Sequence, residues 1–144
     1  MMKKNEKKPS ICNCLNLRRA SAAITKIYDE KLAASGITVS QYSLLKHIAL
    51  LGPVSVSELA VKLRLDRTTL VRNLKPLEAA ACIMDISQKG SRNRRLQLTE
   101  KGNKKYEEAE QLWKEAQNFI EQSLGKENME KLTSLLSMIE SLEL

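Results

Sequence analysis

Apolar side chains recur at helical intervals over most of this chain, and only three prolines and five glycines interrupt it. Between Leu15 and Leu32 the apolar positions recur at helical intervals among charged ones, which predicts an amphipathic helix that ends near Gly36. A second, largely buried helix is expected to begin at a Ser40 cap and to stop at Gly52-Pro53. The pattern therefore predicts a mainly helical protein.

The next stretch predicts two short helices joined by a tight turn, which is a helix-turn-helix. A helix over Val56–Leu63 hides one apolar face, and Asp66 can cap a following helix from about Arg67 to Ala80. Pro76 removes one backbone donor from that second helix and is expected to bend it. Opposite its leucines, the second helix carries side chains that can donate and accept hydrogen bonds: Thr68, Arg72 and Lys75, with Thr69 and Asn73 toward one flank.

Two short β-like segments follow, "CIMDIS" and "RRLQLT", separated by a polar and basic stretch. They predict a two-stranded hairpin with a basic tip. Thr99 can cap a long helix reaching about Leu124, and Gly125 separates it from a last helix rich in leucine. These two C-terminal helices carry more apolar residues than one small domain needs to cover, so a second copy of the chain is the expected partner.

Length and charge narrow the class of protein. With 144 residues and 16.2 kDa the chain is expected to form one domain. The net charge of +7 and the pI near 9.4 favour an anionic partner, with nucleic acid first. No apolar run approaches the roughly 18 residues of a membrane span, and the charged N-terminus is not followed by a signal core. We expect a cytoplasmic, nucleoid-associated protein without a membrane partner.

The order of these elements is that of a winged helix-turn-helix with flanking helices, and the sequence resembles the MarR family of bacterial transcriptional regulators. The matching stretches are "ITVSQYSLLKHIALLGPVSVSELAVKLRLDRTTLVRNLKPLEAAACIM" and "RNRRLQLTEKG". The resemblance implies a mainly α (α+β) fold: six helices with a two- to three-stranded wing, in an intertwined homodimer. It divides the chain into a basic tail (1–11) and a single domain (12–144), in which 12–35 and 100–144 form the dimer and 38–99 bind DNA.

The resemblance and groove chemistry together assign the DNA contacts. A recognition helix in the major groove lets Arg72 reach a guanine edge, while Thr68 and Thr69 contact a thymine methyl or phosphates. Ser55 and Ser57 can hold a phosphate. In the resembling family a wing arginine enters the minor groove, and the match here is Arg92, with Arg94 behind it. The full set of expected DNA-binding residues is Ser55, Ser57, Arg67, Thr68, Thr69, Arg72, Asn73, Lys75, Arg92 and Arg94.

Two departures from the family pattern concern the wing and the helix before it. The family usually has acidic residues where this chain has Ser91 and Asn93, which leaves the pairing of Arg94 with an acid in the wing open. The family also favours glycine where this chain has Ala81, and a left-handed helix end disfavours a residue with Cβ. Taken alone, a basic run such as "KGSRNRR" is usually a solvated surface; its place after a helix-turn-helix favours DNA binding.

Other candidate residues concern regulation. Family members often bind small ligands where the flanking helices meet the winged part, and the residues of interest there are Arg18, Tyr28, Tyr42, His47 and Trp113, although tryptophan and tyrosine at such spacing are more often core residues. Cys12 and Cys14 could sense oxidation, because the arginines about one turn beyond favour a thiolate. Burial or indifference is the simpler interpretation of both cysteines. A metal site is not expected, since too few soft ligands accompany them.

These observations predict a homodimeric, sequence-specific DNA-binding regulator that acts as a repressor on a palindromic operator. A phenolic or other aromatic effector, or thiol oxidation, would release it. The alternative is a constitutive nonspecific or architectural DNA-binding protein. An enzyme is not expected, because no acid and nucleophile accompany His47 at a motif spacing, and no cofactor is expected either.

Overall fold

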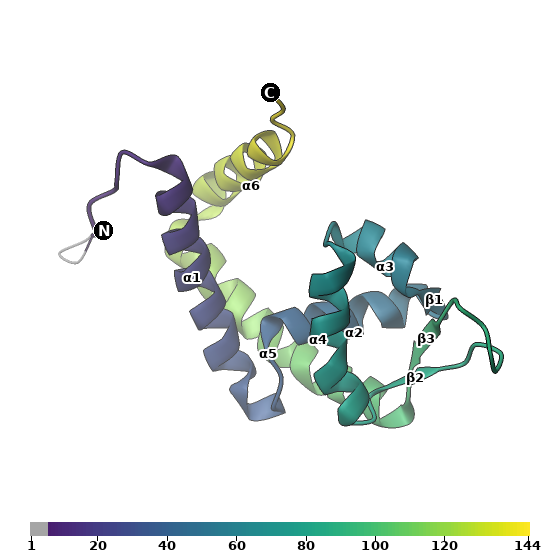
Figure 1. The fold of residues 1–144 in the computed structure, drawn as a ribbon. Coiled ribbons are helices and arrows are strands. Elements are labelled where there is room, and N and C mark those ends of the chain that lie inside the picture. The colour runs from purple at the N-terminus through teal and green to yellow at the C-terminus, as the bar shows by residue number, and fades with distance from the viewer. Residues whose placement is uncertain (1–5) are drawn as a thin grey trace.

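The computed structural model describes residues 6–144; residues 1–5 of the predicted basic tail lie outside this range. Figure 1 shows a winged part, built from α2 (Val39–Leu51), α3 (Val56–Leu63), α4 (Arg67–Ala79) and the strands. It is set beside the flanking helices α1 (Asn13–Leu32), α5 (Glu100–Leu124) and α6 (Lys126–Glu140). Helix α5 belongs to both parts, since its beginning packs on the sheet and its later turns pack on α1. The fold is a mainly helical winged helix-turn-helix with flanking helices, as the sequence predicted.

The first two helices are those that the periodicity predicted. Helix α1 covers Asn13–Leu32 and continues as a 3-10 turn, η1, over Ala33–Ser35. Gly36 then ends this segment in the left-handed conformation (φ 79°). Helix α2 covers Val39–Leu51.

The predicted Ser40 cap of α2 is wrong. Thr38 is the cap, because its side chain accepts a hydrogen bond from the Gln41 amide while the Gln41 side chain accepts one from the Thr38 amide. This reciprocal capping box satisfies two backbone donors at once, whereas Ser40 already lies inside the first turn.

The helix-turn-helix consists of α3 (Val56–Leu63) and α4 (Arg67–Ala79). Arg64 ends α3 in the left-handed conformation (φ 54°), and Asp66 caps α4 by accepting from the Thr69 amide at 2.8 Å. Pro76 lies inside α4, and the helix continues beyond it, as shown by the bond from the Ala80 amide to the Pro76 carbonyl at 3.0 Å.

The wing is built on a three-stranded antiparallel sheet in the order β1-β3-β2. The strands are β1 (Val54–Ser55), β2 (Ile83–Asp85) and β3 (Arg95–Leu98). Leu96 of β3 faces Val54 on one side and Asp85 on the other. The sheet thereby ties the entry into α3 to the hairpin that follows α4.

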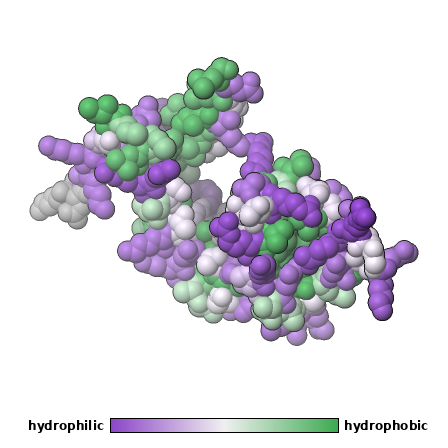
Figure 2. All heavy atoms as spheres, viewed as in Figure 1, coloured by the Kyte–Doolittle hydropathy of each residue, from purple (hydrophilic) through white to green (hydrophobic). Residues whose placement is uncertain are grey.

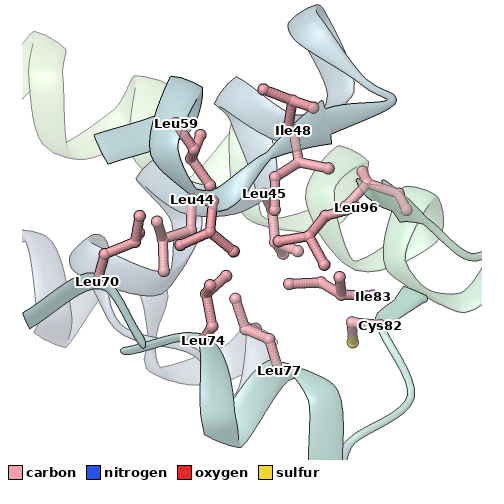
Figure 3. Close-up of a cluster of buried hydrophobic side chains, with 13 residues drawn as sticks. Leu44, Leu45, Ile48, Leu59, Leu70, Leu74, Leu77, Cys82, Ile83 and Leu96 are labelled. Carbon is pink, nitrogen blue, oxygen red and sulfur yellow. The ribbon is translucent and has the colours of Figure 1, made fainter. Parts of the chain in front are cut away.

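One apolar cluster holds the winged part together (Figure 3). It collects leucines from α2, α3 and α4 and the inward residues of the strands. The fully buried members include Leu44, Leu45, Ile48, Leu59, Leu70, Leu74, Leu77, Cys82 and Leu96. Cys82 is therefore a core residue at the start of the wing, as expected for a cysteine in an apolar position. Burying nine such side chains fixes α4 firmly against α2, α3 and the sheet.

The C-terminal helices are α5 (Glu100–Leu124), which Thr99 caps as predicted, and α6 (Lys126–Glu140). No residue of α6 is buried within the chain. Figure 2 shows hydrophobic side chains gathered over the end of this helix. The exposed apolar residues of α5 and α6 are Phe119, Leu124, Leu132, Leu135, Leu136, Met138 and Ile139, with Leu142 beyond them. Within residues 6–144, no helix is long and apolar enough to cross a membrane.

Candidate nucleic-acid interface

The exposed face of α4 carries the predicted recognition residues. Arg67, Thr68, Arg72 and Lys75 line one shallow hollow of about 370 Å³ together with Val71. The leucines on the opposite face are fully buried, so the helix presents its polar row to solvent on a rigid base. A polar row of this kind carries donors and acceptors of the type that read base edges in a groove.

The flanking residues of α4 are partly engaged within the chain. The hydroxyl of Thr69 donates to Asp66 Oδ2 at 2.7 Å, and bonds from Thr69 lower the pKa of Asp66. Asn73 is half-buried on the flank of the helix. Thr69 keeps its acceptor lone pairs and methyl group for other contacts, but its hydroxyl proton is already used in the cap.

The start of α3 lies next to the wing across a polar hollow. Ser55 is the cap of α3 and accepts from the Glu58 amide at 3.0 Å, while Ser57 accepts from Arg67 at 3.1 Å. The hollow has a volume of about 690 Å³ and is lined by Ser55, Ser57, Glu58, Ile86, Ser87, Gln88, Ser91, Asn93 and Arg95. The predicted phosphate-binding serines therefore lie between α4 and the wing.

The tip of the wing is a turn held by hydroxyl bonds. Gly90 adopts the left-handed region (φ 86°), and the hydroxyl of Ser91 contacts both the amide and the carbonyl of Asn93 at 3.2 Å. Ser91 and Asn93, which replace the family's acids, thus bracket Arg92 with a small local turn. Arg92 is exposed and forms no ion pair within residues 6–144.

Arg94, in contrast, is paired twice. Its guanidinium donates to Glu78 of α4 and lies 3.4 Å from Asp85 of β2. The bond with Glu78 raises the pKa of Arg94, although partial burial opposes this effect. Arg94 therefore does have acidic partners, and both of them, Glu78 and Asp85, lie outside the wing tip.

Arg95 was not among the expected DNA-binding residues, yet it lies at the same surface. Its guanidinium donates to the Pro53 carbonyl at 2.9 Å, and its side chain is exposed at the polar hollow. The signal that could have found it is the alternation of β3, in which Arg95 and Gln97 face away from the buried Leu96 and Leu98.

Three of the five expected effector-site residues come together in an aromatic stack. The rings of Tyr28 and Tyr42 lie 6.3 Å and 5.7 Å from that of Trp113, and Tyr106 follows at 5.9 Å from Tyr42. Lys46, which sequence reasoning missed, places its ammonium 5.0 Å from the Trp113 ring centre. All three tyrosines and the single tryptophan of the chain thus form one column.

Tyr42 is the most enclosed member of the stack. Its side chain is buried, and its hydroxyl has no hydrogen-bond partner among residues 6–144. Burial, followed by the charge of Glu110, raises the pKa of Tyr42 above its ordinary value. Tyr28, at the end of the column opposite Tyr106, donates its hydroxyl to Gln117.

The other two expected effector residues lie elsewhere. Arg18 borders an open hollow near the beginning of α1 that also contains Cys14. His47 contacts the Ser43 carbonyl of its own helix at 2.8 Å. Neither side chain is part of the aromatic column.

The two N-terminal cysteines lie at the start of α1, where Cys12 is the cap residue and both side chains are exposed. The Cys12 amide donates to the Ser10 hydroxyl at 3.0 Å, and Ser10 and Asn16 exchange two bonds at 2.8 Å. Among the described residues, no three side chains of metal-binding type are grouped together.

A helix-turn-helix with an exposed polar recognition face and a basic wing beside it defines a winged-helix DNA-binding protein. Comparison with known proteins agrees. The MarR family profile matches residues 35–84. The M. tuberculosis transcriptional regulator MosR, solved in complex with DNA, is 31% identical, with a TM-score of 0.77 over 92% of this chain and 99% of that one.

The regulator FarR of Neisseria gonorrhoeae is 28% identical over 90% of this chain and 89% of its own. The repressor CouR, solved with p-coumaroyl-CoA, shares the fold at a TM-score of 0.78 and 23% identity, over 90% of this chain and 91% of its own. The chain belongs to the MarR family, and it is a helix-turn-helix DNA-binding transcriptional regulator.

Proposed function

We propose that the protein is a homodimeric repressor that binds a palindromic operator and is released by a small effector. The observation that carries this proposal is the rigid polar row of α4 beside the exposed Arg92 of the wing. One surface offers a helix for a major groove and an arginine for the neighbouring minor groove.

The residues proposed to read sequence are Arg72, Thr68 and Asn73. Arg72 is suited to a guanine edge because its planar guanidinium can form two parallel hydrogen bonds. Arg67, Lys75, Thr69, Ser55 and Ser57 are proposed to hold phosphates, which fixes the register of the protein on DNA without reading sequence.

The dimer is supported by the uncovered apolar surface of α6. This helix buries none of its own residues, and its apolar row includes Leu135, Met138 and Ile139, which are 54%, 63% and 43% exposed. Exposed apolar rows of this length are covered in stable soluble proteins. A second copy using the same helices gives two-fold symmetry, and two recognition helices about 34–36 Å apart then require a palindrome.

The test is to select binding sites from a random duplex library and to measure the mass of the free protein by light scattering. We expect a palindrome whose half-sites are one helical turn apart, and a dimer at micromolar concentration. Equal affinity for selected and scrambled duplexes at one fixed salt concentration would instead support the constitutive nonspecific protein.

The aromatic column is the proposed effector site. Tyr42 supplies an enclosed hydroxyl that has no hydrogen-bond partner within residues 6–144, and Lys46 and Trp113 supply a cation and a flat apolar face. A phenolic or other aromatic acid would satisfy these groups. The CouR structure with p-coumaroyl-CoA shows that the same fold holds an aromatic acyl ligand in another protein.

The effector is proposed to act by favouring one spacing of the two winged parts, since α5 joins the column to the sheet. Its test is a titration of the protein–operator complex with hydroxycinnamic and salicylic acids. Release by one of them from wild type, and a loss of that response in Tyr42→Phe with unchanged operator affinity, would support the site. Equal release from both proteins would place the effector elsewhere.

Oxidation of Cys12 and Cys14 is a second candidate trigger, because both thiols are exposed two residues apart at the first turn of α1. Peroxide would oxidise one thiolate to a sulfenic acid, and attack by the other thiol would release water and form a disulfide. That bond would distort the start of the helix. Peroxide should then weaken operator binding in wild type and in Cys82→Ser, but not in Cys12→Ser; equal sensitivity of all three would exclude this trigger.

A further inference from the structure

Three elements of the DNA-binding surface meet at one side chain. Arg94, just before β3, donates through one terminal nitrogen to Glu78 of α4, and its Nε lies 3.4 Å from Asp85 Oδ2 of β2. These three side chains are 37%, 31% and 34% exposed, so the pairs are half-shielded from water. Half-buried ion pairs of this kind hold geometry better than freely exposed ones.

Asp85 extends the same connection into both strands of the wing. Its second oxygen accepts from the Ser87 amide at 2.8 Å and from the Arg95 amide at 3.1 Å. Hydrogen bonds donated by Ser87 and by the Arg95 amide hold the pKa of Asp85 at about 2, so the carboxylate is charged at neutral pH. Both strands therefore leave the sheet at one fixed point, directly opposite the end of α4.

The two central arginines of the wing consequently differ in what they can do. Arg92 lies at the tip, exposed and without an ion pair within residues 6–144. Arg94 lies between two carboxylates, whose charges exceed its own. Arg94 could bind a phosphate only if its ion pairs with Glu78 and Asp85 were both broken. Two unpaired carboxylates would then lie close to the DNA backbone.

We propose that Arg94 is a positioning residue rather than a DNA contact: with Glu78 and Asp85 it fixes the wing relative to the recognition helix. The proposal rests on the DNA-binding surface proposed above and assigns a different role to one of its residues. Fixing the wing before binding removes the ordering cost that a free hairpin would incur when Arg92 enters the minor groove. We call Arg94, Glu78 and Asp85 together the clamp. The clamp couples major-groove and minor-groove recognition within each protomer.

Glu78→Gln separates this role from a direct contact by the sign of its effect. The substitution makes the protein more positive, so an Arg94 that binds DNA would be released and would strengthen binding. A clamp predicts the opposite: about tenfold weaker binding to the selected operator duplex, with binding to a scrambled duplex of equal composition unchanged or slightly stronger. Glu58→Gln is the matched control, because it makes the same charge change at the same surface on an acid without an ion pair among the described residues.

The salt dependence of binding gives a second, independent readout. Arg94→Met should weaken operator binding with an unchanged slope of log affinity against log salt concentration, whereas loss of a phosphate contact lowers that slope by about 0.9. Asp85→Asn should reproduce the Glu78→Gln phenotype and serves in its place if that variant does not fold.

Each outcome either supports or excludes the positioning role of Arg94. Weaker operator binding with an unchanged slope, in Glu78→Gln but not in Glu58→Gln, supports the clamp. Stronger binding of Glu78→Gln, or a lower slope for Arg94→Met, makes Arg94 a DNA contact. A lower melting temperature with unchanged operator affinity makes the pairs merely structural. If wild type itself does not distinguish operator from scrambled DNA, the proposed function fails, not the clamp.

Discussion

Gly102 packs directly on the backbone of Cys82: a Cβ atom at position 102 would lie 2.0 Å from the Cys82 carbonyl oxygen. The same carbonyl accepts from the Thr99 amide at 3.0 Å, and the Thr99 hydroxyl donates to the Ala81 carbonyl at 2.7 Å. The first turn of α5 is thereby joined to the backbone between α4 and β2. This junction is where the flanking helices and the DNA-binding part meet.

The first prediction is that Gly102→Ala lowers the free energy of unfolding by about 3 kcal/mol, because the backbone on both sides must move to admit a methyl group. Gly90→Ala is the control: it introduces a methyl group into open space at a positive φ, at a cost of about 1 kcal/mol. Urea unfolding monitored by circular dichroism measures both values. Equal losses would show that the contact at Gly102 yields easily.

Ala81 adopts the left-handed conformation (φ 60°), at the position where the resembling family favours glycine. Ala81→Gly should therefore stabilise the protein by about 1 kcal/mol, because it removes the Cβ strain of that conformation. Ala79→Gly, at the end of α4, should instead destabilise by up to about 1 kcal/mol. Thermal unfolding of the two variants side by side tests the opposite signs; a loss of stability in both would contradict the strain.

Arg72→Ala should reduce operator affinity by about 1–3 kcal/mol and relax the preference at one base pair of each half-site. Lys75→Ala, from the same face of α4, should weaken operator and scrambled duplex alike, as expected for a phosphate contact. Binding titrations against duplexes with single base-pair changes distinguish the two effects. Equal losses for Arg72→Ala on all duplexes would count against base reading.

Arg92→Ala should weaken DNA binding and make its salt dependence shallower by about 0.9 in the log–log slope. The reason is that the exposed guanidinium at the wing tip is expected to displace counterions from the minor groove. Affinities measured at four or more salt concentrations give the slope. An unchanged slope would remove Arg92 from the DNA contacts.

The lowered pKa of Asp85 predicts a specific pH dependence of the stability of the fold. Its pKa of about 2 in the folded chain lies below the value of about 3.9 expected after unfolding, so its carboxylate stabilises the fold above about pH 4. That contribution is lost as the pH falls from about 4 toward 2. The difference in unfolding midpoint between wild type and Asp85→Asn should therefore shrink between pH 6 and pH 3; a constant difference would contradict the lowered pKa.

Periodicity was sufficient to predict the helices and the hairpin, because each helix buries a leucine face on a common core. It failed at the start of α2, where Thr38 and Ser40, two residues apart, can each cap a helix. Only the reciprocal bonds between Thr38 and Gln41 decide between them. It also could not find the partners of Arg94. Glu78 is 16 residues away in the sequence, and only the packing of α4 against the wing brings it close.

Only three of the five predicted effector-site residues lie together, and the reason is similar. Tyr28, Tyr42 and Trp113 meet because their helices cross at that level. Arg18 lies ten residues before Tyr28, which is about 15 Å along the same helix. Residue type identified candidates for ligand chemistry, but distance along a helix axis decided which of them could act together.

The aromatic column also gives the protein its own optical reporter. Trp113 is the single tryptophan of the chain, and it stacks on two tyrosines beneath the Lys46 ammonium. None of these neighbours is a residue proposed to touch DNA. Its fluorescence therefore comes from one junction only. Separation of α1, α2 and α5 would change the quenching by Lys46 and the tyrosines, so the emission follows that movement in the unlabelled protein, whether or not DNA is bound.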